Sequence, residues 1–399
     1  MFLASASGVY AIEFAVFGAL TSVILPIRIG AVDPVGKVGS LALVLAVSAG
    51  VTLIAQPLFG ALSDRTRSRF GRRLPWVIGC SVLAAAFLIA FAGFDSVLWI
   101  CIVWSVVQFS LNGVDVVVTA SIVDRYPGTG RGRAFGIVGA ATIAGGALGA
   151  LAAGLVPERY AVLCLIGGVL ILGVAAWYAA ANREASTLGA PRPAFRVSRF
   201  LRGFWVDPRR SPAFAWMFAS RFVFILGSQA VFGYILYILT DHLGLEERAA
   251  TGLVGLCVAI GGALMLAAIL VAGWASDRVG RRTPFLLVAC GADAIGTTLL
   301  LVMPSVPAVF AYTVLHAIGT GIYIVIGLAL VSEVLPDPVD SAAKDLGLYN
   351  VATNVAQLFA PLAAAALIGM LGGYAALLGV SAVLILAAGL LLLPLRRTH

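Results

Sequence analysis

The chain has 399 residues, of which 61% are hydrophobic and only 11% are charged, and its mean hydropathy is +1.05. Soluble domains carry roughly 25% charged residues, so this composition excludes a water-soluble globule and predicts an integral membrane protein. The net charge of +8 is not gathered on a soluble basic domain, and we therefore expect no nucleic-acid partner.

Apolar segments of about 20 residues are long enough to cross a hydrocarbon core of about 30 Å as helices, and helices satisfy their own backbone hydrogen bonds. The sequence predicts about twelve such helices, at residues 7–27, 39–62, 75–94, 97–123, 134–156, 160–181, 213–239, 251–273, 284–303, 307–331, 346–367 and 373–395. The expected fold class is all-α, and the lipid bilayer is the expected surrounding. Glycines in the span 134–156 predict a close helix crossing.

A basic loop occurs twice in the chain. Its first copy runs Gly-Ala-Leu-Ser-Asp-Arg over residues 60–65 and continues to Gly-Arg-Arg at 71–73, and its second copy covers residues 273–282. Asp277 follows Asp64 by 213 residues, about half the chain, and the tetrapeptide Ala-Val-Phe-Gly at 15–18 recurs at 230–233. The repeat predicts two pseudo-symmetric six-helix halves, at 1–181 and 213–399, joined by a linker at 182–212.

Arginines separate the loops into two sets. The loops after the second, fourth and eighth helices, the linker after the sixth and the C-terminal end carry most of them, whereas the loops after the odd-numbered helices carry few. Lys and Arg accumulate in short cytoplasmic loops, so we expect both termini in the cytoplasm of a cell with a bacterial-type plasma membrane. The five cysteines are far apart and lie in apolar segments, so we expect neither a disulfide framework nor a metal site.

Two six-helix halves, each with a Gly-x-x-x-Asp-Arg-x-Gly-Arg-Arg type loop between its second and third helices, resemble the major facilitator superfamily of secondary transporters. The longer first loop, Ser63 to Arg73 followed by Pro75 and Trp76, is similar to that of glycoside-pentoside-hexuronide symporters and plant-type sucrose transporters. The resemblance implies a monomeric transporter without cofactor whose halves rock about a small-molecule substrate near the bilayer midplane.

The loop residues are candidates for gating. Carboxylates at helix ends can accept hydrogen bonds from backbone amides at a neighbouring helix N-terminus, and the arginines can pair with carboxylates of the other half. The alternative for most of these arginines is that they only set the orientation of the chain in the membrane, as the positive-inside rule describes. The candidates are Asp64, Arg65, Arg72, Arg73, Asp277, Arg278, Arg281 and Arg282.

In the superfamily that the chain resembles, the first and fourth helix of each half line the cavity. An ionisable side chain at membrane depth is costly and therefore a functional candidate. Candidates for substrate binding or proton coupling on these four helices and on the eleventh are Glu13, Asn112, Asp115, Arg221, Gln229, Tyr234, Tyr312, His316, Asn350 and Asn354. The alternatives are that Arg221 extends to the inner surface, that Asp115 pairs with a loop arginine and that His316 is a packing residue.

Asp293 lies in the ninth predicted helix, outside the cavity helices. A carboxylate facing lipid is untenable, so it is expected to hydrogen-bond the tenth helix, with His316 as a possible partner. Such a pair serves either as a proton relay or as a structural link between helices.

The chain departs from sodium-coupled glycoside symporters in its second helix. Those proteins carry two carboxylates before the basic loop, where this chain reads Gln56 and Pro57, so proton coupling is favoured over a sodium site. Three functions remain open: a proton-coupled transporter of a small organic solute such as a sugar or glycoside, a proton-driven exporter of a hydrophobic metabolite or drug, and a non-transporting receptor or scaffold. No phosphate loop, metal cluster or nucleophile motif points to an enzyme.

Overall fold

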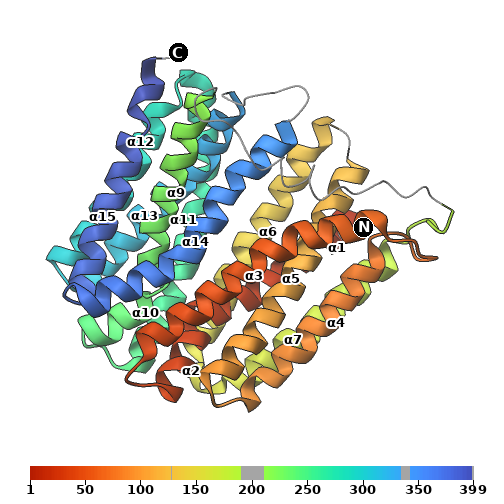
Figure 1. Cartoon of the computed structure of the whole chain (residues 1–399), viewed down its shortest axis with the longest axis horizontal. Helices are drawn as coiled ribbons and strands as arrows, with labels where there is room; N and C mark the ends of the chain where they lie inside the picture. The colour runs from red at the N-terminus through yellow and green to blue at the C-terminus, as the bar shows by residue number, and fades with distance from the viewer. Residues whose placement is uncertain (127, 190–210, 334–341, 398–399) are drawn as a thin grey trace. The chain divides into compact units, whose positions relative to one another are not determined.

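The computed structural model describes residues 1–126, 128–189, 211–333 and 342–397, and this part of the chain is helical, with no β-strand (Figure 1). In the first half the helices are α1 (Phe2–Ala19), η1 (Leu20–Ile24), α2 (Leu25–Val32), α3 (Lys37–Arg65), α4 (Leu74–Ala90), η2 (Phe91–Gly93), α5 (Val97–Arg125), α6 (Gly128–Leu155), η3 (Pro157–Arg159) and α7 (Tyr160–Ala181). In the second half they are α9 (Pro212–Phe232), α10 (Ile235–Tyr237), η4 (Ile238–His242), α11 (Glu247–Val279), α12 (Thr283–Val302), α13 (Val306–Glu333), α14 (Ala342–Met370), α15 (Tyr374–Leu390) and η5 (Leu393–Arg397).

Twelve helical segments within these described ranges are long and apolar enough to cross a membrane, which confirms the number predicted from the sequence. The chain forms two compact units, one of Met1–Phe195 with Thr251–Ala259 and the other of Arg196–Ala250 with Ile260–His399. We refer to them as unit 1 and unit 2. Residues 190–210, most of the predicted linker, lie outside the described residues.

The two units repeat one packing pattern. In unit 1 the first helix α1 packs against the fifth, α6, and the sixth, α7, while the third, α4, packs against the fourth, α5, and α7. In unit 2 the corresponding helices pair in the same way, because α9 packs against α14 and α15, and α12 packs against α13 and α15. The duplicated sequence therefore folds into duplicated bundles.

The closest crossing in unit 1 joins α1 to α6. Gly145, Gly149 and Gly18 lie so near to the backbone of the facing helix that a Cβ atom on any of them would overlap it. Small residues permit such backbone contact between membrane helices, and the close crossing predicted from the glycines of α6 is confirmed.

Two of the predicted helices are interrupted by π-helical turns in the described part of the chain. The first contains the π-helical turn η1, and the seventh changes from α9 through the short α10 into the π-helical turn η4. The sequence spans 7–27 and 213–239 gave no sign of these turns. The first helix also begins at Phe2, so Glu13 is deeper than a start at residue 7 implies.

Candidate functional site

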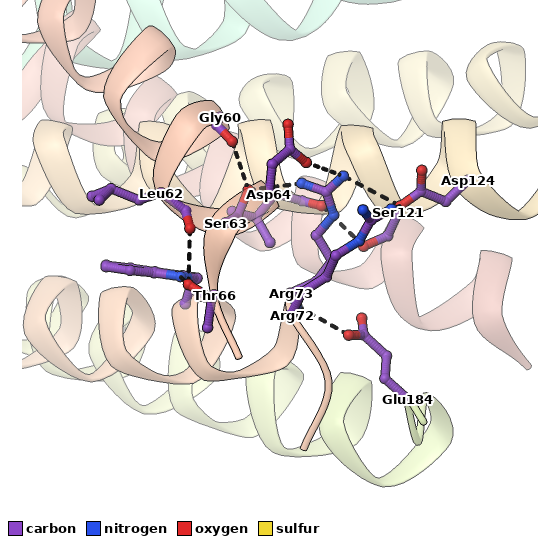
Figure 2. A network of polar contacts seen from close by, with 12 residues as sticks. Gly60, Leu62, Ser63, Asp64, Thr66, Arg72, Arg73, Ser121, Asp124 and Glu184 are labelled. Atoms are coloured by element: carbon purple, nitrogen blue, oxygen red, sulfur yellow. Dashed lines mark hydrogen bonds and ion pairs between the residues drawn. The ribbon is translucent and has the colours of Figure 1, made fainter. Parts of the chain in front are cut away.

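The basic loop of unit 1 is organised around Arg73, whose side chain is 6% exposed (Figure 2). Its Nη2 lies 2.9 Å from Asp64 Oδ1 and 3.2 Å from Asp124 Oδ2. Its Nη1 donates to Ser63 Oγ at 2.7 Å. Arg72 reaches the same carboxylate, Asp124, at 2.7 Å, but its side chain is 40% exposed. The loop, the end of α3 and the end of α5 are therefore joined by one network of charges.

A second carboxylate fixes the backbone of this loop. Glu184, which follows α7, accepts a hydrogen bond of 3.0 Å from the backbone N–H of Arg73, the residue immediately before α4. The side chain of Glu184 lies against Gly71, whose φ of +86° is in the left-handed region that favours glycine. We expected Asp64 to bind a backbone amide at a helix start, but at α4 that position is taken by Glu184, and Asp64 binds a guanidinium.

The second copy of the loop has a simpler network. Arg282 Nε lies 2.6 Å from Glu333 Oε1 and its Nη2 lies 3.9 Å from Asp277 Oδ1. Arg278 stacks over the Trp274 ring. Arg281, like Arg65 of the first copy, is exposed. The ion pairs of Arg72, Arg73 and Arg282 thus lie inside their own units, whereas the sequence suggested partners in the other half.

Unit 1 carries an acidic cluster at membrane depth. Glu13 of α1 is 5% exposed, its Oε1 has no hydrogen-bond partner in the described part of the chain, and it lies within electrostatic range of Asp115 of α5. Thr119 Oγ1 donates to Asp115 Oδ1 at 3.4 Å and is hydrogen-bonded to Tyr10 Oη, which also donates to the Asp115 backbone oxygen at 3.1 Å. Neither carboxylate has an ion-pair partner among the described residues, so Asp115 does not pair with a loop arginine there.

Asn112 lies one turn before Asp115 and links α5 to α3. Its Nδ2 donates to Thr52 Oγ1 at 3.1 Å and to the Gln108 carbonyl oxygen at 2.8 Å, while Gln56 Nε2 donates to its Oδ1 at 3.4 Å. Gln56 and Thr52 lie in the stretch of α3 where a pair of carboxylates would have indicated a sodium site. Here the stretch supplies neutral hydrogen-bonding groups.

Unit 2 contains a buried triad of polar side chains. Asp293 of α12 is fully buried, its Oδ1 lies 2.9 Å from His316 Nδ1 of α13, and its Oδ2 accepts from Ser228 Oγ of α9 at 2.5 Å. The His316 ring stacks on Tyr312 and Phe232. The expected contact between Asp293 and His316 is confirmed, and the triad links three helices.

Arg221 of α9 is buried and does not extend to the surface. It is 9% exposed, its Nε donates to Thr353 Oγ1 of α14 at 2.6 Å, and its guanidinium carbon lies 4.4 Å from the centroid of the Tyr349 ring. This side chain is therefore oriented by two neutral groups of one neighbouring helix.

The other candidates of unit 2 are spread over α9 and α14. Tyr234 is buried, and its Oη donates to the Pro361 carbonyl oxygen at 3.2 Å. Gln229 and Asn354 are half-buried, whereas Asn350 is exposed. The structure therefore singles out Arg221 and the triad in this unit.

The sequence profile of the Major Facilitator Superfamily matches residues 4–269 and 236–399. The chain belongs to this superfamily. It is therefore a multi-pass membrane transporter and not an enzyme, and its substrate is a small molecule bound within the membrane.

Solved structures of other facilitators share the fold. A bacterial homologue of the human lysosomal transporter Spinster, in an inward-facing and occupied conformation, is 15% identical, with a TM-score of 0.71 over 100% of this chain and 96% of that one. A mutant of the nucleoside transporter NupG is 12% identical, with a TM-score of 0.77 over 98% of each chain. At these identities the likeness concerns the fold alone.

One curated relative shares a short stretch with this facilitator. An uncharacterized symporter of Synechocystis sp. (strain PCC 6803) is 57% identical over 37 residues, which are 9% of this chain and 7% of the symporter. The match is too short to carry the activity of that protein to this one.

Several side chains of the facilitator's polar clusters were not singled out from the sequence. Tyr10 precedes Glu13 by three residues, a spacing that places both on one helix face and that was a usable signal. Thr119, Thr353 and Tyr349 gave none, because lone hydroxyl groups are common in membrane helices. Within the described ranges, no group of three or more His, Cys, Asp and Glu side chains is placed to hold a metal ion.

Proposed function

We propose that this facilitator is a proton-coupled secondary transporter of a small organic solute. The observation that carries the proposal is the acidic cluster of Glu13 and Asp115. A buried carboxylate, Glu13, and a half-buried one, Asp115, lie in one bundle with no cation beside them in the described part. Such a pair is stable only when a proton or another cation neutralises part of its charge.

The depth of the cluster supports this role. Glu13 lies eleven residues after Phe2, where α1 begins, which at 1.5 Å per residue is about 16 Å along the helix. Asp115 lies ten residues before Arg125, where α5 ends, which is about 15 Å by the same measure. The two spans, of 31 and 29 residues, are longer than a hydrocarbon core of about 30 Å, so both carboxylates lie inside the core in the half nearer the basic loops. A transporter of this kind exposes a site within the membrane to either side in turn.

The neutral groups around the cluster favour protons over sodium. Hard cations require several oxygen ligands, and the corresponding stretch of α3 presents Thr52 and Gln56, both hydrogen-bonded to Asn112 of α5. The short stretch shared with an uncharacterized symporter is in line with ion-coupled transport. The arginine-rich loops place both termini in the cytoplasm, at a plasma membrane, and we expect a monomer.

We expect the charge networks of the two basic loops to gate the transporter. Asp64, Arg65, Arg72 and Arg73 in unit 1 and Asp277, Arg278, Arg281 and Arg282 in unit 2 lie at helix ends of the proposed cytoplasmic face. Breaking and remaking such networks biases a two-state transporter toward one orientation.

The test is solute-driven pH change in proteoliposomes that hold the purified protein. D-Glucose, methyl glycosides, D-glucuronate and tetraphenylphosphonium are added in turn, and the variants are Glu13→Gln and, as a surface control in the same unit, Glu158→Gln. Proton entry with a solute that is lost in Glu13→Gln and kept in Glu158→Gln supports the proposal.

Other outcomes separate the remaining functions. Proton release against tetraphenylphosphonium identifies a proton-driven exporter. Solute movement without proton movement excludes proton coupling. Binding without movement of any bound solute favours a receptor or scaffold.

A further inference from the structure

Unit 2 holds a buried positive charge at membrane depth. Arg221 lies nine residues after Pro212, where α9 begins, which is about 14 Å along the helix. A guanidinium inside a hydrocarbon core is costly, and such side chains pair with an opposite charge or mark a substrate path.

The other buried arginines of the described ranges are neutralised by carboxylates. Arg28, also 9% exposed, pairs with Asp95 at 2.6 Å. Arg73, 5% exposed, pairs with Asp64 and Asp124. Both of these buried arginines are thus compensated by carboxylates.

Arg221 is the exception. Among the described residues no carboxylate lies within ion-pair distance of its guanidinium, and its hydrogen bond goes to the neutral Thr353 through Nε. The buried acid of unit 2, Asp293, is two turns away at the level of Ser228 and holds Ser228 and His316 with its two oxygens. The positive charge of Arg221 is therefore not balanced by that acid.

The contacts of Arg221 orient it for a ligand. The bond from Nε to Thr353 and the stacking of the guanidinium on the Tyr349 ring fix the plane of the group. With Nε occupied, Nη1 and Nη2 form the pair of donors that matches the two oxygens of a carboxylate. A fixed guanidinium loses less side-chain freedom when it binds such an anion.

We propose that Arg221 binds the carboxylate of the transported solute, so that the substrate class is a small organic acid. The inference rests on the proposed transport function and adds the charge of its substrate. Thr353 and Tyr349 act as positioning residues for the guanidinium.

The experiment compares matched acids and neutral analogues on purified protein in phosphatidylcholine nanodiscs. The pairs are D-glucuronate with D-glucose and benzoate with benzyl alcohol, and binding is measured by isothermal titration and by thermal stabilisation. We expect at least one acid to bind about tenfold or more tightly than its neutral analogue, which corresponds to about 1.4 kcal/mol.

Variants assign that preference to Arg221. Arg221→Gln removes the preference for the acid, Arg221→Lys keeps part of it, and the control Arg248→Gln, at an exposed position in the first turn of α11, leaves it unchanged. Thr353→Val keeps the charge but releases Nε, so it weakens acid binding severalfold. A ligand-free melting curve for each variant shows whether the fold is retained.

Four outcomes overturn the inference. The first two are that no acid binds and that the neutral analogues bind as well as the acids. The third is that the preference survives Arg221→Gln in a folded protein, and the fourth is that Arg221-dependent stabilisation appears only with added phosphatidylglycerol, which identifies a lipid headgroup.

A failure of proton coupling is distinguishable from a failure of this inference. Uptake of an acid through Arg221 without proton movement contradicts the proposed coupling and leaves this inference intact, whereas proton-coupled uptake of neutral solutes alone does the reverse.

Discussion

The crossing of α1 and α6 allows a prediction with a control in the same helix. In Gly149→Ala the new Cβ would lie 2.5 Å from the carbonyl carbon and 2.6 Å from the Cα of Ala15, and still nearer to its carbonyl oxygen. An ordinary carbon–carbon contact is about 3.5 Å, so the helices must separate by about 1 Å. No rotamer change relieves the overlap, because the facing atoms are backbone.

The expected loss of stability follows from these distances. Overpacking costs about 1–3 kcal/mol, and the better helix propensity of alanine returns up to about 1 kcal/mol. The free energy of unfolding should therefore fall by about 1–2 kcal/mol in Gly149→Ala. In Gly139→Ala, where no atom lies within 4 Å of the new Cβ, it should stay unchanged or rise slightly.

A thiol-reactive fluorescent dye measures the difference during heating in detergent. The five cysteines are free and buried, so the dye reports their exposure on unfolding, and the apparent midpoint is compared at one heating rate because such unfolding is often irreversible. If both variants melt at the same temperature, the backbone contact between α1 and α6 is not what the structure indicates.

Two further changes test the polar networks by the same assay. Arg73→Gln should lower the free energy of unfolding by about 2–3 kcal/mol, because it removes a buried charge with three side-chain partners. Arg72→Gln should lower it by less than about 1 kcal/mol, because Arg72 is at an exposed position. Equal losses would contradict the burial of Arg73. Asp293→Asn should cost about 1.5–3 kcal/mol, the range for hydrogen bonds to a charged group. His316→Gln should cost less in the Asp293→Asn background than alone, and additive losses would mean that the two side chains do not act together.

The sequence predicted the membrane class, the number of helices and the repeat, because each depends on a pattern along the chain. Apolar length sets the spans, and two copies of one loop reveal the duplication. The buried contact between Asp293 and His316 was also predicted, since a carboxylate at membrane depth requires a partner and few partners exist.

The rest of the sites depends on how helices are rotated against one another, which a single sequence does not give. Arg221 was compatible with a surface position until its contacts with Thr353 and Tyr349 were seen. Glu184 was not expected to bind the backbone of Arg73, since 111 residues separate them. Such pairs follow from packing, and no local pattern predicts them.

The wide turns η1 and η4 affect how substitutions in the first and seventh helices are interpreted. In each, a backbone amide bonds the carbonyl five residues earlier, from Leu25 to Leu20 and from Leu243 to Ile238, so one extra residue enters the turn. Each side chain beyond it is rotated by about 100° from the face that an uninterrupted α-helix would assign. In a cysteine-accessibility scan of either helix, the periodic pattern of labelled positions will therefore shift at the turn. The turns lie within one helical turn of matching positions in the two repeats, so the same shift is expected in both copies.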